Sequence, residues 1–307
     1  MLFRRNIKAH LALFFVNALY GANHILAKGV MPRYLSPNVF ILFRVAGATL
    51  LFWLLKLLYT RDEKVGKKDL RLIGLCAFFG VAVNQLFFFH GLNLSSSINS
   101  GIYMAVNPIV VVVMSFFILK ETITPLRIAG ILLGTISTIL LTFTAGTGGE
   151  DSALGDLFLF INAVSYALYL VMIKPIMSKY SALTVITWVF TFGLIYVLIF
   201  PPTFIDLANT NFEGIPTDAW GKISYVIVGV TFLTYLMTMY GLKFLSPSTS
   251  AVFIYFQPIM VIFFAYVFAH IGLSDDYTQT ITVPKLGYML LIFLGVYLTI
   301  RTEKKIA

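Results

Sequence analysis

The chain has 307 residues, of which 59% are apolar and only 11% are charged, whereas soluble domains carry roughly 25% charged residues. This composition excludes an ordinary soluble globular protein, because so much apolar surface could be buried only with lipid as the solvent. The single cysteine, Cys76, excludes a disulfide within the chain, and the meaning of the +9 net charge depends on where the basic residues lie.

Apolar runs separated by turn-forming segments predict ten membrane-spanning helices, because about 20 apolar residues cross a hydrocarbon core of about 30 Å. Charged or Gly- and Pro-rich segments, such as 61–69, 145–151 and 201–218, separate these runs. Residues 1–28 would also fit a cleaved signal peptide, but the first helix has a counterpart in the sixth, which favours a retained helix. The predicted helices are residues 9–28, 36–59, 69–91, 98–119, 125–144, 154–173, 181–200, 221–243, 248–270 and 284–300.

Basic residues are distributed unequally between alternate connections. With the N-terminus in the cytoplasm, seventeen of the 22 basic residues lie at the cytoplasmic side and four lie outside. This asymmetry predicts a multi-pass protein of the cell inner (cytoplasmic) membrane with both termini cytoplasmic. The basic residues form thin strips along the membrane, which would attract anionic lipid head groups and which argue against nucleic acid as a partner.

Two segments 150 residues apart, 91–109 and 241–259, resemble each other. Each has a Ser/Asn/Thr-rich turn followed by an apolar helix with an amide and a proline midway, Asn107–Pro108 and Gln257–Pro258. The similarity predicts an internal duplication, with one repeat at 9–143 and the other at 154–300. Five helices per repeat is an odd number, so the predicted fold is an all-α membrane protein of two inverted five-helix repeats. Such repeats enclose one site and support alternating access.

Four motifs follow one another along the chain: ALYGANHILAKG at 18–29, FRVAGA at 43–48, ILKETIT at 118–124 and LSPSTSAVFIYFQPIM at 245–260. In their order and spacing they resemble the EamA family of the drug/metabolite transporter (DMT) superfamily. The resemblance implies ten helices, inverted repeats, a central cavity and export of small metabolites, often amino acids. The second half departs from the pattern in two ways. The acidic Glu121 has no counterpart in 269–274, and the position that corresponds to Arg44 in the second repeat is Phe190.

Polar and aromatic side chains within the predicted spans are candidates for a substrate cavity, because a polar group at mid-bilayer costs a few kcal/mol unless it is buried or hydrated. Spacing of three or four residues places several of them on shared helix faces. The same groups would also serve as interhelical hydrogen bonds or interfacial anchors, so both roles stay open. The candidate substrate-binding residues are Asn17, Tyr20, His24, Arg44, Asn84, Phe88, Asn99, Tyr103, Asn107, Asn162, Tyr166, Tyr169, Tyr235, Phe253 and Gln257.

Arg44 is the deepest charge in the predicted spans. It would bind a substrate carboxylate, or it would pair with carbonyls and amides as a structural strut. Pro108 and Pro258 each remove a helix hydrogen bond, so they would kink their helices for gating or free a carbonyl for a polar ligand. No Asp or Glu lies deep in a span, which leaves His24 and His90 as the groups that could couple transport to protons.

Motifs of membrane-embedded enzymes, such as HExxH, GxSxG or paired acids in a span, are absent, so we predict no enzyme, no metal and no cofactor. The predicted function is a secondary transporter, with export favoured, of small polar or amphipathic metabolites such as amino acids. The alternatives are a non-transporting sensor or binding protein, or a drug or nucleotide-sugar carrier of the same fold. The predicted partners are a small-molecule substrate and the lipid bilayer. Gly130 and Gly134 form a GxxxG motif that would permit a homodimer through the fifth and tenth helices.

Overall fold

The computed structural model describes residues 2–27, 30–31, 33–60, 62–94, 97–145, 152–270 and 283–301. Every regular element within these residues is helical. The elements are α1 (Leu2–Ala27), α2 (Pro37–Tyr59), α3 (Lys67–Ala77), the π-helical segment η1 (Phe78–Val83), α4 (Asn84–Leu94), α5 (Ser97–Leu119), α6 (Pro125–Ala145), α7 (Ala153–Met177), α8 (Ala182–Ile199), α9 (Pro201–Ala208), α10 (Thr217–Tyr225), the π-helical segment η2 (Val226–Leu233), α11 (Thr234–Phe244), α12 (Pro247–Ala251), the 3₁₀ segment η3 (Val252–Tyr255), α13 (Phe256–His270) and α14 (Val283–Arg301).

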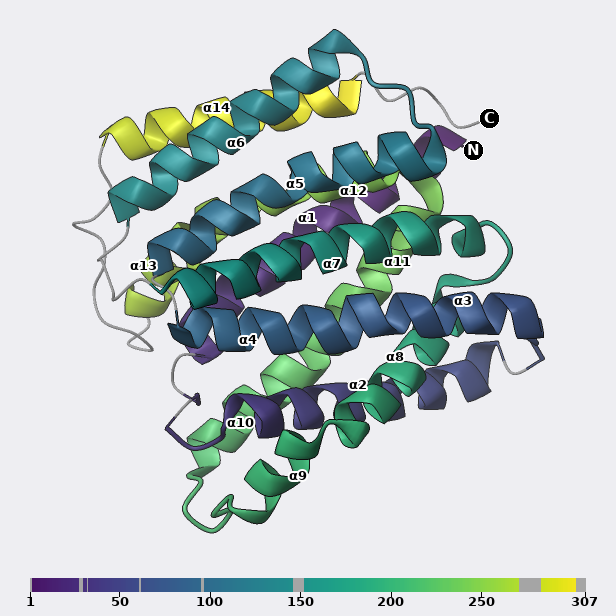
Figure 1. Ribbon diagram of the computed structural model, residues 1–307. Coiled ribbons are helices and arrows are strands. Elements are labelled where there is room, and N and C mark those ends of the chain that lie inside the picture. The colour runs from purple at the N-terminus through teal and green to yellow at the C-terminus, as the bar shows by residue number, and fades with distance from the viewer. Residues whose placement is uncertain are drawn as a thin grey trace.

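The long helices lie side by side and cross the bundle in alternate directions, and α14 ends on the side where α1 begins (Figure 1). Helix occupies each of the ten predicted ranges to within one residue at its ends, over the residues that the structure describes. The expectation for 201–218 was wrong in part, because this connection contains α9. Pro201 and Pro202 occupy the first turn of α9, where a helix needs no N–H donor and where the fixed φ of proline fits.

Serine side chains begin several of the helices. Ser36 accepts a hydrogen bond from the Val39 N–H at 3.3 Å at the start of α2, and Ser246 accepts one from the Thr249 N–H at 3.1 Å at the start of α12. Proline follows both serines in the first turn. A serine oxygen replaces a missing intrahelical acceptor, so these local signals fix the ends of the helices.

Six helices of the described chain are long and apolar enough to cross a membrane. Their outer faces expose large apolar side chains, among them Leu58, Val283 and Leu290, each with at least 70% of its surface exposed. Water would penalise such a surface, whereas lipid would not. The six spans are Pro37–Tyr59, Lys67–Gly91, Ala153–Met177, Ala182–Ile199, Thr217–Phe244 and Val283–Arg301, and Tyr103–Leu119 and Pro125–Leu141 are shorter apolar helices.

Elements recur along the chain at a spacing of 150 residues. The starts of α3 and α10, the ends of α4 and α11, and the starts of α5 and α12 are each 150 residues apart. A π-helical segment interrupts both helix pairs, η1 in the first and η2 in the second. The packing follows the same scheme, since α1 packs against α11 and α13 while α7 packs against α4 and α5. Helices α1 and α7 therefore each pack against two helices from the other half of the chain.

Glycines bring α6 and α14 into close contact at one edge of the bundle (Figure 1). A Cβ atom on Gly295 would lie 2.7 Å from the Gly130 carbonyl oxygen and 2.8 Å from the Gly134 nitrogen. The GxxxG motif thus packs against a glycine of the same chain, and its small residues let the two backbones approach.

We expect Gly295→Ala to lower the apparent melting temperature of the purified protein, because its methyl group would press on two backbone atoms and overpacking costs about 1–3 kcal/mol. Gly287 on the same helix has open space around its Cα, so Gly287→Ala is the matched control. The control should be neutral or slightly stabilising, since alanine is the better helix former. Equal melting temperatures for the two variants would contradict the close packing of α6 and α14.

Candidate functional site

A buried arginine lies where helices from both halves of the chain meet. Arg44 on α2 is 6% exposed, and its Nε donates a hydrogen bond to Thr231 Oγ1 in η2 at 3.0 Å. Its Cζ lies 5.7 and 5.2 Å from the ring centroids of Phe40 and Phe89. Nη1 and Nη2 form no hydrogen bond or ion pair with the described residues. One hydroxyl group and two aromatic faces therefore hold the charge.

Tyr20 and Tyr235 lie near Arg44, and Tyr166 and Tyr169 lie near these two tyrosines; we call Tyr20, Arg44, Tyr166, Tyr169 and Tyr235 the arginine–tyrosine cluster. Tyr20 on α1 and Tyr235 on α11 lie within electrostatic range of the guanidinium. Tyr166 on α7 interacts in turn with Tyr20 and Tyr235, and its ring centroid is 6.3 Å from that of Tyr169. The structure thus brings together five of the predicted site residues.

Hydrogen bonds fix three hydroxyl groups of this cluster. Tyr20 accepts from Thr234 Oγ1 at 3.2 Å, and Tyr235 donates to the Gly80 carbonyl oxygen at 3.4 Å. The Tyr169 hydroxyl group donates to Met239 Sδ at 3.4 Å. All three bonds link different helices, so the cluster is a packed, oriented group of side chains at the interface between the halves.

The two π-helical segments supply the backbone of this site. In η2, Thr231 Oγ1 donates to the Val226 carbonyl oxygen five residues earlier, at 2.8 Å, while it accepts from Arg44. In η1, the Gly80 carbonyl oxygen receives the Tyr235 hydroxyl, and a Cβ on Gly80 would lie 2.4 Å from the Tyr169 ring. Only glycine fits there without displacing the tyrosine. Short π-helical segments often mark functional sites, because they redirect side chains and free backbone groups.

The chemistry of the cluster suits an anion with an attached apolar or cationic group. A guanidinium presents a planar fork of donors that matches a carboxylate, and aromatic faces attract cations. A buried charge without an acidic partner costs several kcal/mol, so a bound carboxylate would relieve that cost.

Three buried amide side chains on different helices, Asn17, Gln257 and Asn107, are together called the amide group. Gln257 Nε2 on α13 donates to Asn17 Oδ1 on α1 at 3.0 Å, and Asn17 Nδ2 donates to the Leu13 carbonyl oxygen at 2.7 Å. No hydrogen bond among the described residues joins Asn107 to the other two. Gln257 Oε1 and Asn107 Oδ1 are buried and have no hydrogen-bond partner in the part of the chain that the structure describes. Buried acceptors of this kind are open to a ligand or to water.

Other predicted site residues make contacts with residues outside these two groups. Asn162 Nδ2 donates to the Asn84 carbonyl oxygen at 2.7 Å, which links α7 to α4, and Phe88 packs edge-on against Phe89. Tyr103 lies near Asp156 in the first turn of α7. The Phe253 ring stacks on His10, at 5.7 Å between centroids, near the start of α1. The Asn162 side chain therefore bonds to the backbone of a neighbouring helix, in the way that the structural alternative predicts.

The two prolines lie in different local structures. Helix α5 runs without interruption through Pro108, whereas the 3₁₀ segment η3 directly precedes α13, which contains Pro258. A 3₁₀ stretch inside a helix often marks a hinge. The side chains of His24, Asn99 and Pro258 lie outside the described residues.

His90 belongs to a hydrogen-bonded chain at the opposite end of α4 from η1. Its Nε2 lies 3.2 Å from Asn38 Oδ1, and Asn38 Nδ2 donates to Asp206 Oδ2 at 2.9 Å. The same carboxylate oxygen accepts a bond from Ser36 Oγ at 2.7 Å. These bonds tie α2, α4 and α9 together, and they do not reach the arginine–tyrosine cluster.

One buried ion pair was not predicted as such. Arg127 is one of the seventeen basic residues counted on the cytoplasmic side; it is 3% exposed, and its Nη1 lies 2.9 Å from Glu121 Oε1. Its Nη2 donates to Ser246 Oγ and Thr249 Oγ1, both at 2.9 Å, and Ser248 Oγ donates to the other Glu121 oxygen at 2.8 Å. This network, which we call the Arg127 clamp, joins the start of α6 to the start of α12.

The list of candidate site residues does not include Thr231 and Thr234, which bond to Arg44 and Tyr20, or Gln85, which is buried beside Tyr235. Thr231 lies four residues before Tyr235, so helical spacing was the available signal for it. The glycines Gly80 and Gly229, one in each π-helical segment, were the signal for those segments. Among the described residues, no three His, Cys, Asp or Glu side chains gather as metal ligands would.

Known proteins share this architecture. One solved crystal structure superposes on 96% of this chain and 99% of its own length, with a TM-score of 0.74 at 16% identity, which shows a shared fold. The chain is similar to the uncharacterized transporter YyaM of Bacillus subtilis, with 28% identity over 85% of this chain and 87% of the relative. It is also similar to an uncharacterized transporter of Archaeoglobus fulgidus, with 26% identity over 88% and 90%, and to the WAT1-related protein At4g30420 of Arabidopsis thaliana, with 24% identity over 94% and 83%.

The model of the EamA-like transporter family matches residues 7–143 and again 153–301, which together make up almost the whole chain. Together with the apolar spans, this match identifies the protein as a multi-pass membrane protein that belongs to the EamA-like transporter family.

Proposed function

We propose that this chain is a secondary transporter that exports small polar or amphipathic metabolites, such as amino acids, by alternating access. The observation that carries the proposal is Arg44, whose buried guanidinium keeps two nitrogens without a partner among the described residues at the interface of the two halves. A substrate carboxylate would fill that gap, and a substrate ammonium group would find tyrosine rings nearby.

The proposed architecture has ten spans in two inverted five-helix repeats, 9–143 and 154–300. The 150-residue spacing of the helix ends, the two π-helical segments and the matched packing of α1 and α7 support it. Inversion gives two conformations of similar energy that open to opposite sides. Access to Arg44 would then need the packed tyrosines to separate on one side at a time.

The proposed location is the inner membrane with both termini in the cytoplasm, because this orientation places most of the basic residues inside. The glycine-bearing faces of α6 and α14 already pack against each other within the chain. A homodimer through these two helices would therefore use their outward faces. The substrate sites that we propose are the arginine–tyrosine cluster and the amide group.

A drug or nucleotide-sugar carrier of the same fold is the second candidate. A cationic drug suits the site less well, because no acidic side chain of the described residues contacts the arginine–tyrosine cluster. A non-transporting sensor would bind the same ligands without moving them. A measurement of transport therefore distinguishes the proposed exporter from a sensor. The chemical identity of the released compound distinguishes a metabolite exporter from a drug or nucleotide-sugar carrier.

Cells loaded with a dipeptide mixture should release particular amino acids faster when they express the protein. Asn107→Ala/Gln257→Ala should slow this release about tenfold or more, because two buried amides that could contact the substrate are removed, and each such hydrogen bond contributes about 1 kcal/mol. The matched control is Asn209→Ala/Asn211→Ala, which removes two exposed amides from the connection between α9 and α10. Equal release by both variants, at equal expression, would exclude the amide group from the substrate site, and ligand binding without release would favour the sensor.

A further inference from the structure

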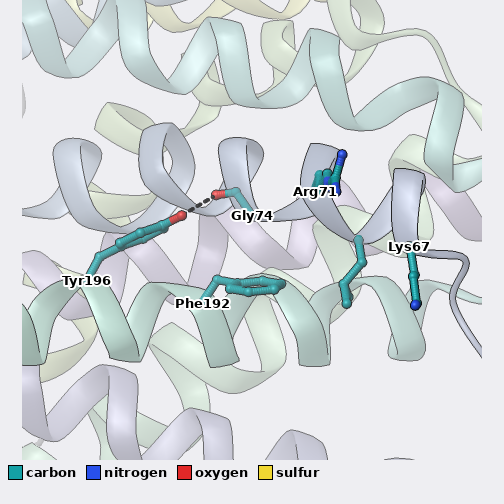
Figure 2. A pocket seen from close by; sticks show the side chains of 6 residues that line it. Lys67, Arg71, Gly74, Phe192 and Tyr196 are labelled. Carbon is teal, nitrogen blue, oxygen red and sulfur yellow. Dashed lines mark hydrogen bonds between the residues drawn. The ribbon is translucent and has the colours of Figure 1, made fainter.

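A groove opens between α3 of the first half and α8 of the second half (Figure 2), and none of its lining residues belongs to the arginine–tyrosine cluster. Its volume is about 460 Å³. In Figure 2 the basic side chains lie at one end of the groove and Tyr196 lies at the other, where its hydroxyl donates to the Gly74 carbonyl oxygen at 3.3 Å. The lining residues are Lys67, Leu70, Arg71, Gly74, Phe192 and Tyr196.

The interior of the groove is apolar because α3 has a glycine there and α8 contributes aromatic rings. Gly74 has no side chain, and a Cβ there would lie only in ordinary contact, 3.7 Å from the Tyr196 hydroxyl and 3.8 Å from the Phe192 ring. The space beside Gly74 is therefore bounded by rings and by Leu70. Further along, Leu75 of α3 and Phe78 at the start of η1 are more than 40% exposed, which is the surface expected to face lipid tails.

The mouth of the groove carries two unneutralised positive charges. Lys67 and Arg71 are exposed, lie one helical turn apart in the first turns of α3, and form no ion pair with the described residues. The nearby carboxylate of Asp69 is already engaged, since it accepts from Lys179 Nζ at 2.8 Å and from the Tyr180 hydroxyl at 2.9 Å.

We infer that this groove binds an anionic phospholipid, with the phosphate on Lys67 and Arg71 and an acyl chain along Leu70, Phe192 and Tyr196. Basic groups at a helix end beside an apolar crevice match the two parts of such a lipid, and basic pockets between membrane helices are known to bind lipid head groups. A soluble phosphate would use only the mouth and would leave the apolar groove empty. The bound lipid would contact both halves of the chain, because α3 and α8 belong to different halves.

The inference depends on the chain being a membrane protein and not on its being an exporter, so lipid binding is measured without flux. The intact protein, purified in detergent, is mixed with phosphatidylglycerol and phosphatidylcholine that carry the same acyl chains, and retained lipids are counted by native mass spectrometry. The wild type should retain phosphatidylglycerol at least about fivefold over phosphatidylcholine. Lys67→Ala/Arg71→Ala should abolish that preference.

The matched control is Lys64→Ala/Lys68→Ala, which removes the same charge from exposed residues of the same segment outside the groove. It should retain phosphatidylglycerol as the wild type does, and equal loss in both double variants would show attraction by net charge alone. Gly74→Leu keeps the charges and fills the groove, so it should also abolish retention; unchanged retention would overturn the acyl-chain part of the site. Inorganic phosphate should not compete with the lipid, and full competition would indicate a free-anion site instead.

Discussion

Arg44→Met is expected to abolish transport while the protein stays folded. A guanidinium–carboxylate pair in a buried site contributes about 3 kcal/mol or more to binding, which corresponds to roughly a hundredfold loss of affinity. Stability should change little or rise, because the described residues hold the charge with one hydrogen bond and two ring contacts, and methionine fills similar volume without desolvating a charge. Uptake into proteoliposomes and the melting temperature in detergent measure the two effects.

Two further variants separate a substrate contact from a structural strut. Arg44→Lys keeps the charge but lacks the planar fork, so we expect it to restore only a small part of the flux. Thr231→Val removes the hydroxyl that orients Nε and should cause an intermediate loss. If Arg44→Met unfolds the protein or lowers its melting temperature in step with its flux, the arginine is a strut and the proposed carboxylate site is wrong.

The positions of the helices were predictable because the signals for them are local. Ser36–Pro37 and Ser246–Pro247 cap their own helices, and an apolar run of about 20 residues is helical in lipid whatever it packs against. The connection 201–218 was harder, because Pro201 and Pro202 are compatible both with a turn and with the first turn of a helix. Local chemistry therefore predicted where most helices begin and end.

The site was predictable only in part, because its bonds join residues far apart in the sequence. The burial of Arg44 followed from its depth in a span, but its partner Thr231 lies 187 residues away. Helical spacing from Tyr235 was the available signal for Thr231, but it was a weak one, because Thr231 lies in a π-helical segment where backbone bonds run to the fifth residue. The chain gave no comparable signal that Arg127 is buried, since an arginine at a helix start near the cytoplasmic side is usually exposed.

Arg127→Met should produce the largest loss of stability. Glu121 is 15% exposed, and removal of its partner leaves a mostly buried carboxylate without a cation, which costs about 3–5 kcal/mol. Ser246 and Thr249 lose a charged donor as well, so the link between α6 and α12 weakens. We expect the apparent melting temperature in detergent to fall by about 5–10 °C.

The matched control for this variant is Arg301→Met, which removes an exposed arginine at the end of α14 and should leave the melting temperature within about 1 °C. Glu121→Gln/Arg127→Met should recover part of the loss, because the double variant leaves no unpaired charge and the new glutamine side chain still presents an oxygen to Ser248. The double-mutant cycle should give a coupling energy of about 1–3 kcal/mol, as expected for groups in direct contact. Additive effects would mean that Arg127 stabilises the chain through packing alone, and that the clamp contributes no electrostatic link between the two halves.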